Sequence, residues 1–255
     1  MDRVLTVAIE AARAAGEIAL AYFRTQLTVE TKADRTPVTE ADRRCEEKIA
    51  ETLGRAFPDM GFLGEETGAR EGRSPARWIV DPIDGTKNFI RGIPFFATLI
   101  ALEEAGEVTA GVIHAPATGE LLYARKGRGA FVDGQPARVS TVSALAQAML
   151  VHGGLGDLMR GPYWRWFLEL VRRTARQRGF GDALGHMQVI RGSAEVVIEP
   201  DVKPWDLAAT KIIVEEAGGR LTDFEGTSSI YSGNAVISNG RVHDAVLEVL
   251  RSPHP

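Results

Sequence analysis

Two acidic residues, three positions apart, follow directly after a short apolar stretch. Residues 78–86 read Trp-Ile-Val-Asp-Pro-Ile-Asp-Gly-Thr, and the three apolar residues are typical of the end of a buried strand. Because Pro82 fixes the chain and lacks an amide hydrogen, Asp81 and Asp84 can turn toward one point. The Ile83 carbonyl is then free as a further oxygen ligand, and such a set suits Mg²⁺. The alternative is a structural turn in which the acids only cap a helix.

Further acidic residues stand where strands are expected to end or helices to begin. Glu65 follows residues 60–63, which are expected to form a strand, and Asp206 is expected in the first turn of a helix. Asp42 lies three positions after Thr39, which is the spacing of a helix-capping box. From the residues alone, Asp42 and Asp206 could therefore be caps and nothing more.

Four of these acids form a candidate metal site. They are Glu65, Asp81, Asp84 and Asp206. So many carboxylates in one pocket would repel one another strongly unless cations compensated their charge. With two Mg²⁺ ions, the cluster could clamp a phosphate ester and activate a water for its hydrolysis.

The chain resembles the inositol monophosphatase family of metal-dependent, lithium-sensitive phosphatases. The resemblance rests on four motifs that span most of the chain in order. They are residues 81–86 (Asp-Pro-Ile-Asp-Gly-Thr), 64–66 (Gly-Glu-Glu), 204–206 (Pro-Trp-Asp) and 216–219 (Glu-Ala-Gly-Gly). The resemblance implies an α+β fold, a layered α/β/α/β/α sandwich in which N-terminal helices and an antiparallel sheet join a C-terminal α/β lobe. It also implies a homodimer that hydrolyses a small phosphorylated metabolite.

The resemblance further implies a set of metal ligands. Glu65, Asp81 and the Ile83 carbonyl would hold one Mg²⁺, and Asp81, Asp84 and Asp206 would hold a second. A third, weaker ion would lie near Glu65, and Mn²⁺ could replace Mg²⁺. The family pattern thus places two to three ions in one site.

Catalytic and phosphate-binding roles are implied in the same way. Thr86, near Asp42, would position and deprotonate the attacking water, and Glu65 is the third residue with a catalytic role. The amides of Gly85 and Thr86 would hold the phosphate, and Asp206 would also contact the substrate. No covalent phosphoenzyme is expected.

Within the family, the chain leans toward histidinol-phosphate phosphatases because Asp182 follows Gly181. Members directed at inositol tend to carry a small neutral residue at this position. Asp182 and Glu199 would offer two carboxylates to the ammonium and imidazole groups of histidinol, which inositol lacks. Asp182 could instead only cap the helix that follows. The alternatives are an inositol-1-monophosphatase, a broad sugar or nucleotide phosphatase of the same family and, more remotely, a non-catalytic metal- or phosphate-binding protein.

Several other residues have roles that the sequence leaves open. Lys32 matches a basic residue near the site in the family, although alone it would be interpreted as solvated. His186 lies one helical turn after Asp182 and could line the same mouth or face water. Whether Arg91 contacts the substrate is open, and His114 is predicted to be a structural histidine.

Composition narrows the class of protein. Of 255 residues, 44% are hydrophobic and 25% charged, which is ordinary for a soluble globular protein. A net charge of −4 argues against nucleic acid or an anionic membrane as the main partner. The single Cys45 excludes an internal disulfide and fits a reducing compartment. Neither a signal peptide nor a membrane-spanning stretch is visible, so a cytoplasmic location is expected.

Hydrophobic periodicity predicts the order of the elements. Helices are expected at residues 2–24, 40–55, 162–175, 182–191, 204–217 and 241–250. Strands are expected at residues 28–32, 60–63, 95–102, 108–114, 121–125, 130–132, 148–152, 178–180, 195–199, 219–223 and 235–238. Residues 71–75 are expected to form a loop, and residues 67–74 could be a mobile flap over the site. Two lobes follow: residues 1–142 with most metal ligands, and residues 143–255 with Asp206 and the specificity residues.

Overall fold

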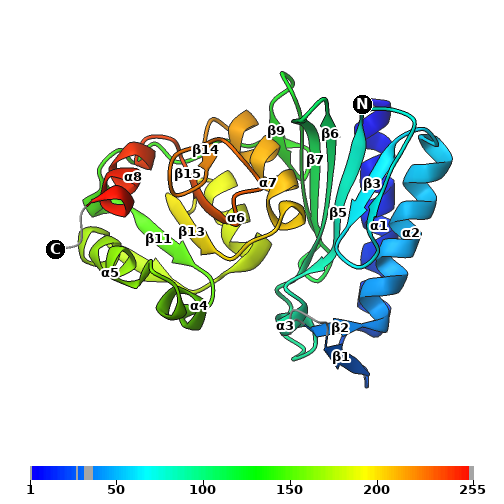
Figure 1. Cartoon of the computed structure of the whole chain (residues 1–255), viewed down its shortest axis with the longest axis horizontal. Helices are drawn as coiled ribbons and strands as arrows, with labels where there is room; N and C mark the ends of the chain where they lie inside the picture. The colour runs from blue at the N-terminus through cyan, green and yellow to red at the C-terminus, as the bar shows by residue number, and fades with distance from the viewer. Residues whose placement is uncertain (1, 27, 32–36, 253–255) are drawn as a thin grey trace.

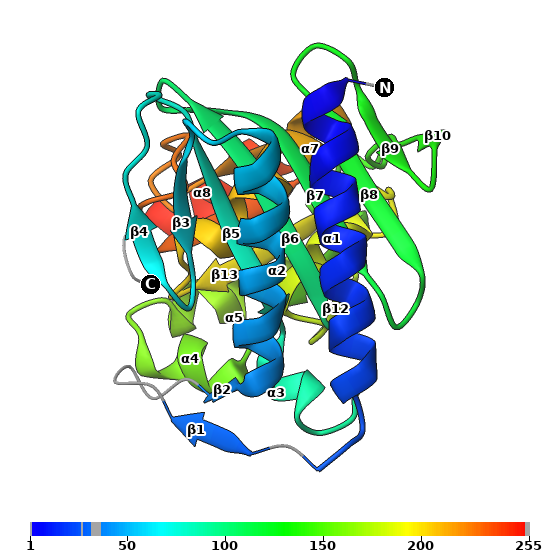
Figure 2. The same ribbon diagram turned by 90° about the vertical axis from the view of Figure 1, so that its right-hand side faces the viewer.

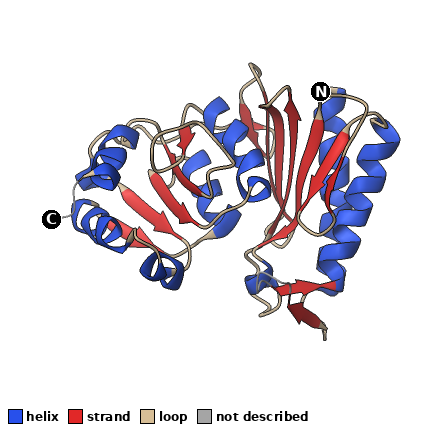
Figure 3. Ribbon diagram, viewed as in Figure 1, coloured by secondary structure: helices blue, strands red, loops and turns tan. Residues whose placement is uncertain are grey.

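The computed structural model describes residues 2–26, 28–31 and 37–252. Its elements stack in five layers, in the order helices, sheet, helices, sheet, helices (Figure 1; Figure 3). The expected α+β layered sandwich is therefore confirmed. We call the part up to β10 (Gln135–Pro136) the N-terminal half and the part from η1 (Leu145–Gln147) onward the C-terminal half.

Two long helices form the outer layer of the N-terminal half. α1 (Arg3–Tyr22) and α2 (Glu40–Ala56) run antiparallel across one face of the larger sheet (Figure 2). α1 turns a row of alanines toward the core, and these small side chains let the two helices approach closely. Although α1 has 20 residues, neither it nor another helix within the described ranges is long and apolar enough to cross a bilayer.

The larger sheet has eight strands in the order β10-β9-β8-β7-β6-β5-β3-β4. Its strands are β3 (Gly61–Gly64), β4 (Gly68–Arg70), β5 (Arg77–Asp84), β6 (Ala97–Glu104), β7 (Glu107–Ala115), β8 (Glu120–Arg125), β9 (Ala130–Val132) and β10. From β5 to β10 all neighbours are antiparallel, as the expected hairpin meander requires, whereas β3 and β5 are parallel. Residues 71–75 form a loop, as expected, but part of the segment expected as a flap forms β4, which pairs with β3. A separate small sheet of β1 (Val29–Thr31) and β2 (Pro37–Thr39) leads into α2.

Two helices from the C-terminal half form the middle layer. α6 (Asp182–Ile190) and α7 (Pro204–Glu216) lie between the two sheets, and α7 packs against β6, β7 and β8 (Figure 1). Their buried residues join apolar residues of both sheets in one core cluster. Because a sheet covers each side, these helices are apolar around most of their circumference. This packing brings the first turn of α7 to the end of β5.

The smaller sheet has five strands in the order β12-β11-β13-β15-β14. These are β11 (Met149–His152), β12 (Arg176–Arg178), β13 (Val196–Pro200), β14 (Arg220–Thr222) and β15 (Asn234–Ser238). The outer helices are α4 (Leu155–Arg160), α5 (Trp164–Arg173) and α8 (His243–Arg251). The helix expected at residues 162–175 is present as α5, whereas α4, which ends at Arg160, was not predicted. The strand expected at residues 178–180 also lies two residues earlier.

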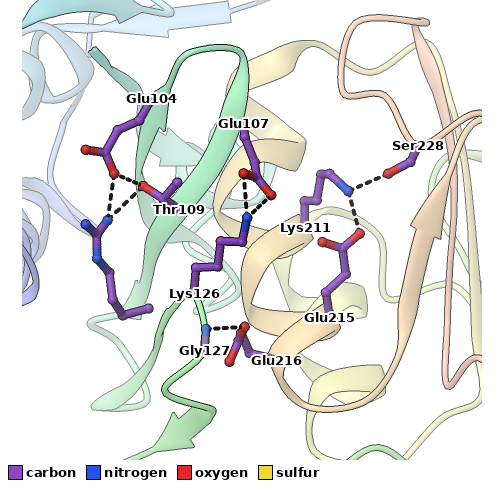
Figure 4. Close-up of polar contacts among 10 residues, drawn as sticks. Glu104, Glu107, Thr109, Lys126, Gly127, Lys211, Glu215, Glu216 and Ser228 are labelled. Atoms are coloured by element: carbon purple, nitrogen blue, oxygen red, sulfur yellow. Dashed lines mark hydrogen bonds and ion pairs between the residues drawn. The ribbon is translucent and has the colours of Figure 1, made fainter.

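Polar contacts join the halves near the C-terminal end of α7 (Figure 4). Glu216 accepts hydrogen bonds from the amides of Gly127 at 2.8 Å and Gly129 at 2.7 Å. A cavity of about 420 Å³, also lined by Lys211, lies beside these contacts. Asp206 belongs to the first turn of α7, about 15 Å away at the rise of an α-helix. The first turn of α7 thus carries Asp206, and its last turn contacts the loop after β8.

Candidate active site

β5 brings Asp81 and Asp84 to one point. The strand is buried along almost its whole length, and its register with β6 shifts between Asp81 and Asp84. Pro82 cannot donate to the ladder, and its carbonyl instead accepts from the Thr98 hydroxyl at 2.9 Å. The resulting bulge changes the strict alternation of side chains along the strand. It lets two acids three residues apart face the same site.

Asp206 completes a cluster with these two acids. Asp81, Asp84 and Asp206 each offer an oxygen, and the three oxygens lie within 4.8 Å of one another. Asp206 also accepts from the Lys203 amide at 2.7 Å, so it caps α7 as well. From the sequence, a helix cap and a metal ligand were alternative roles for Asp206. Because a carboxylate has two oxygens, Asp206 can cap α7 and also bind a metal ion.

The cluster needs positive charge. Burial raises the pKa of Asp81 well above its ordinary value, and the negative charges of Glu65, Asp84 and Asp206 raise it further. Burial likewise raises the pKa of Asp206 to about 7. Among the residues that the structure describes, none is a hydrogen-bond partner of one buried oxygen of Asp81. An orphaned oxygen among crowded carboxylates fits a hard divalent cation.

Glu65 lies beside this cluster, immediately after β3. Its amide donates to the Val80 carbonyl at 3.1 Å, which ties the residue to the neighbouring strand β5. Its charge raises the pKa of Asp81, so the two carboxylates are close. Within the described residues, however, the compact group of three oxygens does not include Glu65.

Thr86 and Asp42 face each other across the start of α3 (Thr86–Phe89). The Thr86 hydroxyl lies 3.0 Å from the Ile83 carbonyl and 3.4 Å from Asp42 Oδ1. The other oxygen of Asp42 accepts from the Thr39 amide at 2.8 Å and the Thr39 hydroxyl at 2.6 Å, forming the expected capping box. Burial raises the pKa of Asp42. Asp42 is thus both a helix cap and a neighbour of Thr86.

Gly85 precedes α3 in a conformation that only glycine adopts easily. Its φ is +84°, and a Cβ here would lie 2.8 Å from the Phe95 carbonyl oxygen. The glycine therefore lets the chain turn from β5 into α3 beside the acids. The amides of Gly85 and Thr86 begin this helical turn, and an anion is favoured at such a position.

Asp182 and Glu199 form a second acidic group in the C-terminal half. Asp182 is solvent-exposed with φ +50°, and the Asn88 side-chain amide donates to it at 3.4 Å. Glu199, on β13, is buried, and its Oε1 has no hydrogen-bond partner within the described part of the chain. Burial raises the pKa of Glu199 well above its ordinary value, and the negative charges of Asp182 and Asp206 raise it further. The amide of Ala183 donates to Asp84 at 2.6 Å, which places this group next to the metal cluster.

Four further residues were considered from the sequence, and the structure describes three of them. His186 neither lines the mouth nor faces water: it is buried, with Nδ1 2.9 Å from the Thr210 hydroxyl, and burial lowers its pKa to about 3. His114 contacts the Ala12 carbonyl at 3.2 Å, as expected of a structural histidine. Arg91 is exposed. Lys32 lies outside the described residues.

Glu46 was not predicted from the sequence to have a role at the site. This residue is fully buried on α2, one turn after Asp42, and its carboxylate accepts from the amides of Glu66 and Thr67. The four-residue spacing between Asp42 and Glu46 puts both acids on one face of α2. That spacing was the available signal for a second functional acid on this helix.

The chain belongs to the inositol monophosphatase family. The sequence model that defines the inositol monophosphatase family matches residues 1–253 of this chain. In the fold and the site, the motifs at residues 64–66, 81–86 and 204–206 lie together around one acidic cluster, as a shared catalytic centre requires. Enzymes of this family are metal-dependent phosphatases.

Similar proteins include phosphatases that are named for different substrates. A histidinol-phosphatase of Mycobacterium tuberculosis is 44% identical over 97% of this chain and 98% of that protein. A fructose-1,6-bisphosphatase/inositol-1-monophosphatase of Thermotoga maritima is 38% identical over 98% of this chain and 96% of that protein. The crystal structure of the extragenic suppressor protein suhB from Bartonella henselae superposes with a TM-score of 0.91, at 34% identity, over 98% of this chain and 99% of that chain.

Proposed function

We propose that this protein is a Mg²⁺-dependent phosphomonoesterase that hydrolyses L-histidinol phosphate to L-histidinol and phosphate. The observation that carries the proposal is the pairing of two acidic groups. The cluster of Asp81, Asp84 and Asp206 suits metal ions and phosphate, while Asp182 and Glu199 suit a cationic alcohol. A hydrogen bond from the Ala183 amide, at the start of α6, to Asp84 holds the two acidic groups side by side.

The proposed metal ligands are carboxylates and one carbonyl. Glu65, Asp81, Ile83, Asp84 and Asp206 would hold two to three Mg²⁺ ions, with Mn²⁺ as a substitute. When bound, the ions supply positive charge that stabilises the attacking and leaving oxygens of the transferred phosphoryl group. The residues themselves hold these charges in fixed positions within a mostly buried site.

Thr86 and Asp42 are the proposed proton carriers. With its hydroxyl proton directed to Asp42 Oδ1 at 3.4 Å, Thr86 keeps a lone pair free to accept a proton from the attacking water. Asp42 then receives the threonine proton, and its raised pKa makes it a better base than an exposed aspartate. The amides of Gly85 and Thr86 would hold the phosphate, so no residue needs to be phosphorylated.

Asp182 and Glu199 are the proposed receptors for the cationic part of histidinol. Glu199 has a buried oxygen with no partner, and an ammonium or imidazolium group would provide the missing hydrogen bond. Asp182 adopts φ +50°, a conformation that costs a non-glycine residue free energy and is often found at functional sites. Inositol would leave both charges uncompensated.

Phosphate release from a panel of phosphomonoesters tests this proposal. With Mg²⁺, we expect the highest kcat/KM for L-histidinol phosphate, and lower values for inositol-1-phosphate, sugar phosphates and nucleotides. With chelator, release from every ester should stop. Higher kcat/KM for inositol-1-phosphate would instead support the activity for which the Thermotoga maritima relative is named. Undiminished turnover in chelator would contradict the metal mechanism.

We also propose that the protein is a cytoplasmic homodimer and that residues 1–142 and 143–255 are its lobes. The buried, unpaired Cys45 supports a reducing compartment. The two sheets, one in each half, support the division into lobes. Light scattering coupled to gel filtration would measure the mass, and twice the mass of one chain is the expected result.

A further inference from the structure

A buried carboxylate on α2 binds the backbone next to Glu65. The Glu46 side chain has no exposed surface. Its Oε2 accepts from the Glu66 amide at 2.9 Å, and its Oε1 accepts from the Thr67 amide at 2.8 Å. Each oxygen of the carboxylate therefore accepts a hydrogen bond from one of two consecutive amides in the turn that follows β3.

Gly64 makes room for this carboxylate. A Cβ at Gly64 would lie 2.5 Å from the carboxyl carbon of Glu46 and 2.5 Å from one of its oxygens. Gly64 does not have the positive φ that would by itself demand a glycine. The close approach of Glu46 therefore explains why no side chain is present at the last residue of β3.

We propose that Glu46 is a positioning residue that fixes the turn after β3 and so aims the Glu65 carboxylate at Asp81. The inference rests on the proposed role of Glu65 as a metal ligand. One helix then organises two parts of the site: Asp42 faces Thr86, and Glu46, one turn further on, holds the turn that carries Glu65. Neither hydrogen bond of Glu46 involves a residue that would contact the substrate.

The two amides require an acceptor with two oxygens. An ionised carboxylate only accepts hydrogen bonds, so each of its oxygens can face an N–H group. Glutamine has nearly the same volume, but its NH₂ group would face one of the two amides as a second donor. Glu46→Gln therefore breaks one hydrogen bond and sets two donors against each other, without opening a cavity. Residues that orient metal ligands typically change metal affinity 10- to 100-fold when they are replaced.

Mn²⁺ binding followed by electron paramagnetic resonance tests the inference, because it counts ions and measures each affinity without turnover. In Glu46→Gln we expect one ion to bind about 10- to 100-fold more weakly, while the other ions keep their affinity. Glu65→Gln should weaken the same ion. Glu47→Gln, an exposed neighbour on α2, is the matched control and should bind like the wild type.

Gly64→Ala provides a second route to the same contact. The added methyl group should push the Glu46 carboxylate away from the amides, and so weaken the same ion as Glu46→Gln. Because both changes break one contact, their effects in the double variant should be much smaller than the sum. Circular dichroism at each step would show that the proteins remain folded.

The outcomes separate this inference from the proposed function. Wild-type Mn²⁺ affinity in folded Glu46→Gln, or additive effects with Gly64→Ala, would overturn the positioning role while leaving the metal site in place. A Glu65→Gln protein that weakens a different ion from Glu46→Gln would also overturn it. A wild-type protein that binds no Mn²⁺ would instead contradict the proposed metal-dependent function itself.

Discussion

The two halves of the molecule present their acids in different ways. In the N-terminal half, Asp42 is held by a capping box, and Asp81 and Asp84 are carried by the central strand β5. In the C-terminal half, Asp182 has a positive φ and Glu199 has an oxygen without a partner. Asp81 has such an oxygen too, so the difference lies in the supports: the first group is held by a strand and a helix cap, whereas Asp182 lies exposed in a strained backbone conformation.

This difference fits two separate tasks. Catalytic and metal-binding groups must already be in place before the substrate arrives, so a sheet and helix caps are suitable supports. A receptor for a cation gains affinity when the ligand supplies the missing hydrogen bonds. We therefore expect changes in the N-terminal half to affect every phosphate ester, and changes at Asp182 and Glu199 to affect the choice of alcohol.

Asp84→Asn should have the largest effect. The change keeps the shape of the side chain but removes a negative charge from the metal cluster, so turnover should fall roughly a thousandfold or more for all substrates. Phosphate release at several Mg²⁺ concentrations would measure the loss, and the far-ultraviolet spectrum should stay that of the wild type. An equally active variant would remove Asp84 from the proposed ligand set.

Thr86→Ala should reduce kcat by about a hundredfold or more, the usual contribution of proton transfer. The hydroxyl is assigned to the attacking water and not to the bound phosphate, so KM and Mg²⁺ affinity should change little. Steady-state kinetics with two unrelated esters would show the same loss for both. A change confined to KM would contradict this assignment.

Asp182→Asn should lower kcat/KM for histidinol phosphate by about 10- to 100-fold. A hydrogen bond to a charged group is worth roughly 1.5 to 3 kcal/mol, and asparagine tolerates the positive φ almost as well as aspartate. Stability should therefore be kept, which a denaturant titration would check. If the variant loses stability and hydrolyses every ester equally slowly, Asp182 supports the fold and has no part in substrate recognition.

Acid should weaken the C-terminal half through His243. The ring is buried between the hydroxyls of Thr222 at 2.9 Å and Ser238 at 2.8 Å, and burial lowers its pKa to about 4. The unfolded chain binds this proton near pH 6.5, so the stabilisation is complete above that pH and is lost as pH falls from 6.5 through 4. Between pH 6 and pH 5, the wild type should lose roughly 1 kcal/mol more unfolding free energy than His243→Gln. Equal losses in urea titrations at the two pH values would contradict the assignment.

Local signals predicted most of the first half and its acids. The sequence placed Asp81, Pro82 and Asp84 correctly at a strand end, because the proline and the apolar residues before it are adjacent in the chain. The capping box of Thr39 and Asp42 is equally local and was found.

Contacts between distant segments could not be predicted in the same way. Glu46 binds amides 20 and 21 residues further along the chain, and although its spacing from Asp42 indicates a shared helix face, no local pattern identifies those partners. The edge strand β4 exists only by pairing with β3, since its own residues are largely exposed. The short helix α4 was not predicted, because six residues are too few to show a helical period.

The most direct test of this division of tasks is the ratio of kcat/KM for histidinol phosphate to kcat/KM for glycerol phosphate, measured with saturating Mg²⁺. The wild type should strongly favour histidinol phosphate. Thr86→Ala should leave the ratio unchanged although both rates fall, whereas Asp182→Asn should reduce it by about 10- to 100-fold. A ratio that Thr86→Ala lowers as much as Asp182→Asn does, or that neither variant changes, would contradict the account.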